Sequence, residues 1–247
     1  MQNMMLRLSY DGTNYHGWQR QPGQRTVQGV LENCLARITG GFEKLIASSR
    51  TDAGAHALDQ VVNFYTLSHL TPMTMARALN SLLPRDIVVR EASLASEGFH
   101  ARYSAKSKLY LYLILNRPYL SPFYSRYSWH ISYPLDMNKI ARAANFLRGR
   151  HDFSSFRAAS CNAKTTIRHI SRLELEERDS FLLFWIGANA FLQHMVRNIV
   201  GTLVEVGRGR HAPEYMEEVL LARDRTKAGP TAPAQGLFLY HVDYEII

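Results

Sequence analysis

The sequence lacks the motifs by which proteins commonly bind nucleotides or metals. It contains no glycine-rich phosphate-binding loop, no dinucleotide-binding fingerprint, and no H-E-x-x-H or C-x-x-C pair. Its two cysteines, Cys34 and Cys161, lie far apart, and neither has a neighbour at metal-ligand spacing. We therefore expect neither a cofactor nor a metal.

Long apolar runs are also missing. No stretch approaches the roughly 20 apolar residues that span a bilayer. The opening residues, MQNMMLRLSYDG, lack the apolar core and cleavage site of a signal peptide. Because so few cysteines suit a reducing compartment, we expect a cytoplasmic protein without membrane association.

Acidic residues are in the minority. The chain has 21 Asp and Glu against 29 Lys and Arg, which gives a net charge of +8 and a pI near 9.6. This balance favours a polyanionic partner such as nucleic acid, although the same charge also serves solubility. At 247 residues, the chain is long enough for one large domain or two small ones.

The first hundred residues predict the order β-α-β-β-α-β. Apolar residues alternate over 4–10, as in a strand, and recur at helical spacing after Thr26, a good helix cap. A second helix starts at Thr71-Pro72 and ends before Pro84. Further strands are predicted over 43–48, 60–66 and 86–94. This is the split βαβ order of ferredoxin-like and RNA-recognition folds.

The second half nearly repeats this order. Strands are predicted over 108–115, 127–131, 166–178, 181–188 and 236–244, and helices over 136–147, over 192–206 and from Pro213. We expect an α+β protein of two ferredoxin-like halves, residues 1–104 and 105–247, joined through a largely antiparallel sheet with a central active-site cleft. No linker marks the boundary, expected near 100–107, so the halves should pack tightly.

The strand KLYLYLIL (108–115) has two different faces. Its leucines lie on one side, while Tyr110 and Tyr112 lie on the other. We expect the leucines to pack against helices and the tyrosines to line the open face, where RNA-binding sheets stack bases. Alternatively, the tyrosines complete a half-exposed sheet.

The stretch S-S-R-T-D-A-G-A-H-A (48–57) combines one carboxylate with small residues. Asp52 follows Arg50 by two positions, and an arginine nearby favours an ionised carboxylate, which suits a nucleophile or an electrostatic stabiliser. Ala and Gly leave room for a planar group against the backbone. The same residues also make good turn chemistry, so both interpretations stay open.

Two further segments bear on this choice. The segment DGTNYHGWQRQ (11–21) gathers residue types that stack on bases or contact phosphates: Tyr15, His16, Trp18, Gln19 and Arg20. The segment FLQHMVRNIVG (191–201) places Arg197 on an otherwise apolar helix. Such an arginine either pairs with a carboxylate such as Asp52 or extends to solvent.

The sequence resembles the tRNA pseudouridine synthase A family nearly from end to end. Five blocks carry the resemblance: YDGTNYHGWQRQ, SSRTDAGAHALDQVVNF, FHARYSAKSKLYLY, FLQHMVRNIVGTLVEVGRGR and APAQGLFLYHVDY. R-T-D-A-G combined with F-L-x-x-M-V-R on a helix is a specific signature. Ser49 and Ala55 replace the family's glycine and valine, both outside the charged core.

The resemblance implies roles for four residues. Asp52 corresponds to the catalytic aspartate, Arg50 to the arginine that helps extrude the target nucleotide, Tyr110 to the tyrosine that stacks on the target base, and Arg197 to the arginine that pairs with the aspartate. It further implies conversion of uridine to pseudouridine at positions 38, 39 and 40 of the tRNA anticodon stem-loop. The family works without cofactor or metal, usually as a homodimer.

Two other functions compete with this one. A non-catalytic RNA-binding protein explains the charge and the sheet tyrosines but leaves Asp52 and Arg197 without a role. A small-molecule lyase or isomerase explains the carboxylate but not the charge. For tRNA, the expected phosphate contacts, which should make binding salt-dependent, are Arg20, Arg25, Arg102, Lys106, Lys108, Arg208 and Arg210.

Overall fold

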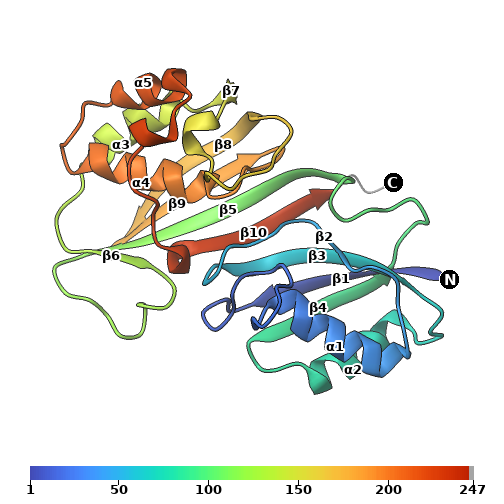
Figure 1. Ribbon diagram of the computed structural model, residues 1–247. Coiled ribbons are helices and arrows are strands. Elements are labelled where there is room, and N and C mark those ends of the chain that lie inside the picture. Colours follow the sequence, from blue (N-terminus) through green and yellow to red (C-terminus); the bar gives the residue numbers. More distant parts are fainter. Residues whose placement is uncertain (245–247) are drawn as a thin grey trace. The chain divides into compact units, whose positions relative to one another are not determined.

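The computed structural model describes residues 1–244, which form two compact units (Figure 1). Unit 1 comprises Met1–Lys106 and the chain from Phe238 onward, and unit 2 comprises Ser107–Leu237. Both units combine helices with mainly antiparallel sheets, so the α+β class is confirmed.

Unit 1 has the split βαβ order that the sequence predicts. Its elements are β1 (Gln2–Tyr10), α1 (Val27–Thr39), β2 (Ile46–Ala47), β3 (His56–Thr66), α2 (Pro72–Leu82) and β4 (Ile87–Leu94). Strand β1 pairs antiparallel with β3 on one side and β4 on the other, and β2 pairs antiparallel with β3. The resulting order β4-β1-β3-β2 is that of a ferredoxin-like sheet.

The core of unit 1 lies between this sheet and its two helices, which run side by side (Figure 1). Alternate residues of β1 face the helices, because side chains of a strand point to opposite faces in turn. Fully buried side chains of this layer are Met4, Leu6, Leu8, Val62 and Phe64 from the strands and Leu31, Leu35, Met75 and Leu79 from the helices. The Thr26 hydroxyl accepts the Gly29 N–H and starts α1, as expected of an N-cap.

The last strand, β10 (Leu237–Tyr244), returns to unit 1. Phe238 and Leu239 pair in parallel with His56 and Ala57 of β3. The buried Asp59 carboxylate accepts the Val242 N–H at 3.2 Å and lies 3.0 Å from His241 Nδ1. The predicted halves place this strand with residues 105–247, whereas the compact units place Phe238 and the residues after it with unit 1.

Unit 2 contains the remaining elements. They are β5 (Ala105–Asn116), β6 (Trp129–Ile131), α3 (Met137–Asn145), β7 (Gly149–Asp152), β8 (Ile167–Arg178), β9 (Phe181–Ala188), α4 (Met195–Gly207) and α5 (Tyr215–Ala222), with short 3-10 turns at Ser154–Phe156, Arg225–Lys227 and Ala234–Gly236. Strand β9 pairs antiparallel with β5 and β8, and β7 pairs antiparallel with β8. Strand β6 pairs in parallel with β5. The three helices gather together (Figure 1).

The two faces of β5 have the opposite assignment to the predicted one. Tyr110 and Tyr112 are 6% and 0% exposed, whereas the leucine face is only partly covered: Leu111 and Leu115 are buried, but Leu109 and Leu113 are half-buried. Burial raises the pKa of Tyr112, and the charge of Arg197 on α4 opposes this with a smaller effect. The tyrosine side is therefore the one that faces this helix. The alternation of leucine and tyrosine along the strand separates its two faces, but it does not predict which face the helices cover. The leucine face carries the long polar side chains of β8, among which Arg172 lies over the Trp185 ring.

The boundaries of several elements differ from the predicted ones. Strand β7 has no apolar alternation and was not predicted; its pairing with β8 makes it a strand. The strand expected over 43–48 shrinks to Ile46–Ala47. Helix α4 begins at Met195 rather than near 192, because His194 adopts a left-handed conformation (φ 64°) that a helix does not continue.

Candidate active site

Asp52 lies in the loop between β2 and β3, residues 48–55, which we call the Asp52 loop. Its side chain is half-buried, and Arg50 is exposed. The Ala55 N–H donates to the Asp52 carbonyl oxygen at 3.1 Å, and Gly54 adopts a positive φ of 77°. The segment is therefore a turn, and the turn presents a carboxylate at its bend.

A second loop, residues 11–25, backs the Asp52 loop through main-chain contacts. The Trp18 N–H donates to the Thr51 carbonyl at 3.1 Å, and the Gly54 N–H donates to the Tyr15 carbonyl at 3.2 Å. The hydroxyls of Tyr10 and Thr51 are 2.8 Å apart. These bonds hold the backbone on both sides of Asp52, so the backing loop fixes where the carboxylate lies.

Two glycines allow this close approach. A Cβ at Gly12 would lie 1.9 Å from the Ala55 carbonyl oxygen, which is impossible without moving the backbone. A Cβ at Gly17 would lie 2.6 Å from the Thr51 carbonyl oxygen, and Gly17 also has a φ of +82°. The sequence hypothesis did not include either glycine, since only the contact between distant segments shows the need for them.

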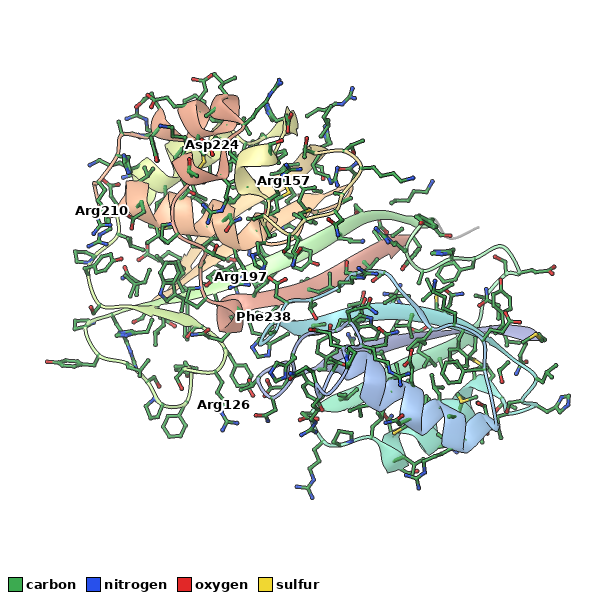
Figure 2. All side chains as sticks on the ribbon, in the orientation of Figure 1. Arg126, Arg157, Arg197, Arg210, Asp224 and Phe238 are labelled. Atoms are coloured by element: carbon green, nitrogen blue, oxygen red, sulfur yellow. The ribbon has the colours of Figure 1, made fainter. Side chains whose placement is uncertain are left out.

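His56 anchors the same arrangement from the first position of β3. Its side chain is 2% exposed, its Nδ1 accepts the Gly12 N–H at 3.1 Å, and its ring stacks on Phe238 at 4.7 Å between centroids (Phe238 is labelled in Figure 2). With Nδ1 as acceptor the imidazole is neutral; in the protonated ring this nitrogen would donate to Asp11 Oδ1, 3.1 Å away. His56 thus joins the backing loop, the Asp52 loop and β10.

The aromatic residues of the backing loop do not form the expected stacking surface. Tyr15 and Trp18 are 3% and 2% exposed. The Tyr15 hydroxyl donates to Asp86 at 2.5 Å, and burial followed by this carboxylate raises the pKa of Tyr15. Both rings therefore support the loop from inside, and of the five residues that the sequence singled out here only His16 and Arg20 are exposed.

Tyr110 lies in the middle of β5, opposite Ile186 of β9. The edge of its ring meets Phe191 at 4.8 Å between centroids, with the planes at 78°. Its neighbour Tyr112 donates its hydroxyl to the Pro233 carbonyl at 2.7 Å, and burial raises the pKa of Tyr112. Phe191 belongs to the F-L-x-x-M-V-R block, yet no pattern in the sequence predicts that it lies beside Tyr110.

Arg197 projects from the first turn of α4 (Figure 2). Its Nε–H donates to the Ala232 carbonyl at 2.7 Å, and the Ala232 N–H donates back to the Arg197 carbonyl at 3.1 Å. A Cβ at Gly201 would lie 1.8 Å from the Pro230 carbonyl, so the segment 229–236 packs closely on this helix. The guanidinium is therefore oriented by a main-chain bond rather than simply extended to water.

Asn198, the next residue on α4, holds this segment through hydrogen bonds, a role that was not predicted from the sequence. It is fully buried, donates to the Phe156 carbonyl at 2.8 Å, and accepts from Thr231 at 2.7 Å and from Arg225 at 3.2 Å. A buried amide in an apolar helix is a signal that such a network exists, because an amide without partners is costly in a core.

Four of the predicted phosphate contacts form ion pairs with acidic residues of their own unit. Arg208 and Arg210 lie 3.6 Å and 2.6 Å from the Glu205 carboxylate. Arg20 lies 3.4 Å from Glu32, and Arg25 lies 3.8 Å from Asp86 and over the Tyr15 ring. The Arg20 and Arg25 side chains are 72% and 52% exposed, so their pairs cost little to open for RNA, whereas Glu205 is buried and its pairs with Arg208 and Arg210 cost more.

The four predicted site residues are distributed over both units, Arg50 and Asp52 in unit 1 and Tyr110 and Arg197 in unit 2. Within residues 1–244, no three His, Cys, Asp or Glu side chains gather as metal ligands would. Over the same residues, no helix is both long and apolar enough to cross a membrane.

Comparison with known proteins finds similarity along almost the whole chain. A family model described as tRNA pseudouridine synthase matches residues 8–104 and 143–245. Proteins named tRNA pseudouridine synthase A are 48% identical in Thermoanaerobacter sp. (strain X514) and 45% identical in Acetivibrio thermocellus, each over 99% of this chain and the full relative. One from Nitrosomonas europaea is 45% identical over 98% of this chain and 89% of the relative. The chain belongs to the tRNA pseudouridine synthase family.

Proposed function

We propose that this protein isomerises uridine to pseudouridine at positions 38, 39 and 40 of the tRNA anticodon stem-loop. The observation that carries the proposal is Asp52, a half-buried carboxylate on a turn that the backing loop and His56 hold in place, within the R-T-D-A-G block of this family. A turn without chemistry has no need of a carboxylate supported on both sides.

The reaction itself fits a single carboxylate. It breaks the bond between N1 of uracil and C1′ of the ribose, turns the base over and joins C5 to C1′. The proton lost from C5 is balanced by the one that N1 gains, so nothing is oxidised and no group leaves. We therefore propose that the enzyme uses neither a cofactor nor a metal.

Asp52 has the central role in this mechanism. Attack on C1′, attack on C6 and removal of the C2′ proton are the three steps open to a carboxylate, and each requires its ionised form. Attack on C1′ gives an ester that is displaced when C5 joins C1′, whereas an adduct at C6 is released by elimination when C5 loses its proton, after C5 has joined C1′. We infer that Arg197 supplies the cation that favours this ionised form, since it is oriented by the Ala232 carbonyl.

Arg50 and Tyr110 act on the nucleotide rather than on the bonds that change. The target base has to leave its helical stack before it can react. We propose that exposed Arg50 fills or holds the vacated position, and that the Tyr110 ring stacks on the released uracil. Stacking is worth roughly 1–3 kcal/mol per base, enough to retain the base and weak enough to let it rotate.

The partner and setting follow from the same proposal. We infer that the substrate is tRNA, that the protein works as a homodimer in the cytoplasm, and that residues 1–104 and 105–247 contribute the aspartate and the tyrosine–arginine pair, respectively. A non-catalytic RNA-binding protein is the competing function, and it would have no use for Asp52.

One experiment separates the two functions. Purified protein is incubated with tRNA carrying labelled uridine, and pseudouridine is measured for wild type and for Asp52→Asn. Asp52→Asn should bind tRNA with unchanged affinity and unfold like wild type, while its product formation falls at least about 1,000-fold, the order expected when a nucleophile is removed. Pseudouridine formation by Asp52→Asn at the wild-type rate would contradict the proposal.

A further inference from the structure

One loop of unit 2 exposes side chains that no role above uses. Residues 117–128, R-P-Y-L-S-P-F-Y-S-R-Y-S, connect β5 to β6, and we call them the aromatic loop (Figure 1). Tyr119 is 82% exposed, Phe123 83% and Leu120 55%. Large apolar side chains gathered on a surface in this way mark a binding site for another molecule.

The aromatic loop is held in one conformation by its own polar groups. The main-chain carbonyl of buried Ser121 accepts the N–H groups of Tyr124 and Ser125 at 3.2 Å and 3.0 Å, and buried Ser128 donates its hydroxyl to the Tyr124 carbonyl at 2.8 Å. The Tyr124 ring packs edge-on against Phe181 of β9 at 5.0 Å. Because the loop is already ordered, a partner that binds it loses little free energy in ordering it.

The charge around the loop selects the kind of partner. The loop itself contains no Asp or Glu, while Arg117 and Arg126 lie inside it (Arg126 is labelled in Figure 2). Two arginines and no carboxylate within the loop favour a polyanion as its partner.

We propose that the aromatic loop binds RNA, with the rings of Tyr119 and Phe123 stacking on unpaired bases. Exposed aromatic rings among arginines form the kind of platform that holds single-stranded nucleic acid, since every base has a stacking face and every nucleotide a phosphate. The proposal rests on the proposed function for the identity of the RNA. The anticodon stem-loop supplies unpaired bases, which lie beyond the uridine that reacts.

The test compares double variants in the full-length protein. Tyr119→Leu with Phe123→Leu keeps an apolar surface but removes both rings, and Tyr119→Phe with Phe123→Tyr keeps both rings. Leu67→Ala with Met73→Ala is the matched control, because these side chains are 72% and 62% exposed in unit 1. For each protein we would measure the Kd for an anticodon stem-loop and for a fully paired duplex, and the sedimentation coefficient without RNA.

The leucine variant should bind the stem-loop at least about tenfold more weakly, while the ring-preserving variant and the control stay within twofold of wild type. Binding to the paired duplex should not change. Wild-type affinity in the leucine variant would overturn the proposal, and so would a change in sedimentation with unchanged stem-loop affinity, which would make the loop a protein interface. Failure of the wild type to form pseudouridine would refute the proposed function alone, since the loop is tested by binding.

Discussion

Tyr110 and Tyr112 lie two residues apart on the same face of β5, yet their surroundings give them different roles. The Tyr112 hydroxyl donates to Pro233 and its ring is completely buried, so it serves the packing of unit 2. Tyr110 is 6% exposed, and the edge of its ring meets Phe191 at 4.8 Å between centroids. The edge-to-face contact with Phe191 fixes the orientation of the Tyr110 ring, which the stacking proposed for it requires.

We expect Tyr110→Phe to retain most activity and Tyr110→Leu to lose it. Phenylalanine keeps the stacking ring, while leucine removes an interaction of about 1–3 kcal/mol, which corresponds to a roughly 5- to 150-fold lower rate. Single-turnover rates on tRNA, with both variants at the same concentration, provide the comparison. Equal rates for the two variants would show that the ring does not act on the base.

At the scale of elements, the backing loop is the part of the site that the sequence placed in the wrong role. Its aromatic residues predicted RNA contacts, whereas Tyr15 and Trp18 are buried and its main chain supports the Asp52 loop. Composition identifies residues that are able to stack on bases. It does not tell whether they face solvent, since that depends on segments that meet only in the folded chain.

Gly12→Ala should test this support directly. A methyl group at Gly12 would lie 1.9 Å from the Ala55 carbonyl oxygen, so the two loops must separate. We expect a loss of unfolding free energy of more than about 2 kcal/mol, together with a lower rate, because such clashes with the main chain do not relax locally.

The matched control is Gly98→Ala. A Cβ at Gly98 has open space, with nothing within 4 Å. Urea unfolding curves and turnover on tRNA would be measured for both variants. If Gly12→Ala is as stable and as active as Gly98→Ala, the backing loop does not determine the position of Asp52.

Other elements were predictable because their signals are local. Thr26, Thr71 and Asp136 each cap the helix that follows, and Thr71 is succeeded by a proline at the first helical turn. R-T-D-A-G combines turn chemistry with a lone carboxylate and left both interpretations open, and the resemblance to the family implied a role for Asp52. Strand β7, the buried face of β5 and the requirement for Gly12 were not predictable, since each depends on pairing or packing with a distant segment.

For the molecule as a whole, burial of three tyrosines sets a limit to stability at high pH. Burial raises the pKa values of Tyr15, Tyr112 and Tyr244, so these phenols stay protonated in the native state. In the unfolded chain they ionise near pH 10. Stability from this source is complete below that pH and falls as pH rises further, because the unfolded state then loses protons that the native state retains.

We therefore expect the unfolding free energy to decline steeply above about pH 10. Tyr112→Phe should decline less steeply, by about 1.4 kcal/mol per pH unit, since one fully buried phenol is removed. The exposed Tyr119→Phe is the control and should follow wild type. Urea unfolding at a series of alkaline pH values, with phenolate absorbance recorded in parallel, gives both slopes; identical slopes for all three proteins would refute the expectation.

The return of β10 to unit 1 links the site to the order in which the chain is synthesised. The ribosome makes β3 and the Asp52 loop early, but all of unit 2 precedes Phe238, the ring that stacks on His56. Until that segment is synthesised, the Asp59 carboxylate lacks its contacts with His241 and Val242, and the sheet of unit 1 lacks β10. A chain whose translation stops within unit 2 therefore has the Asp52 loop without Phe238, so we expect activity only in chains that have been translated through β10.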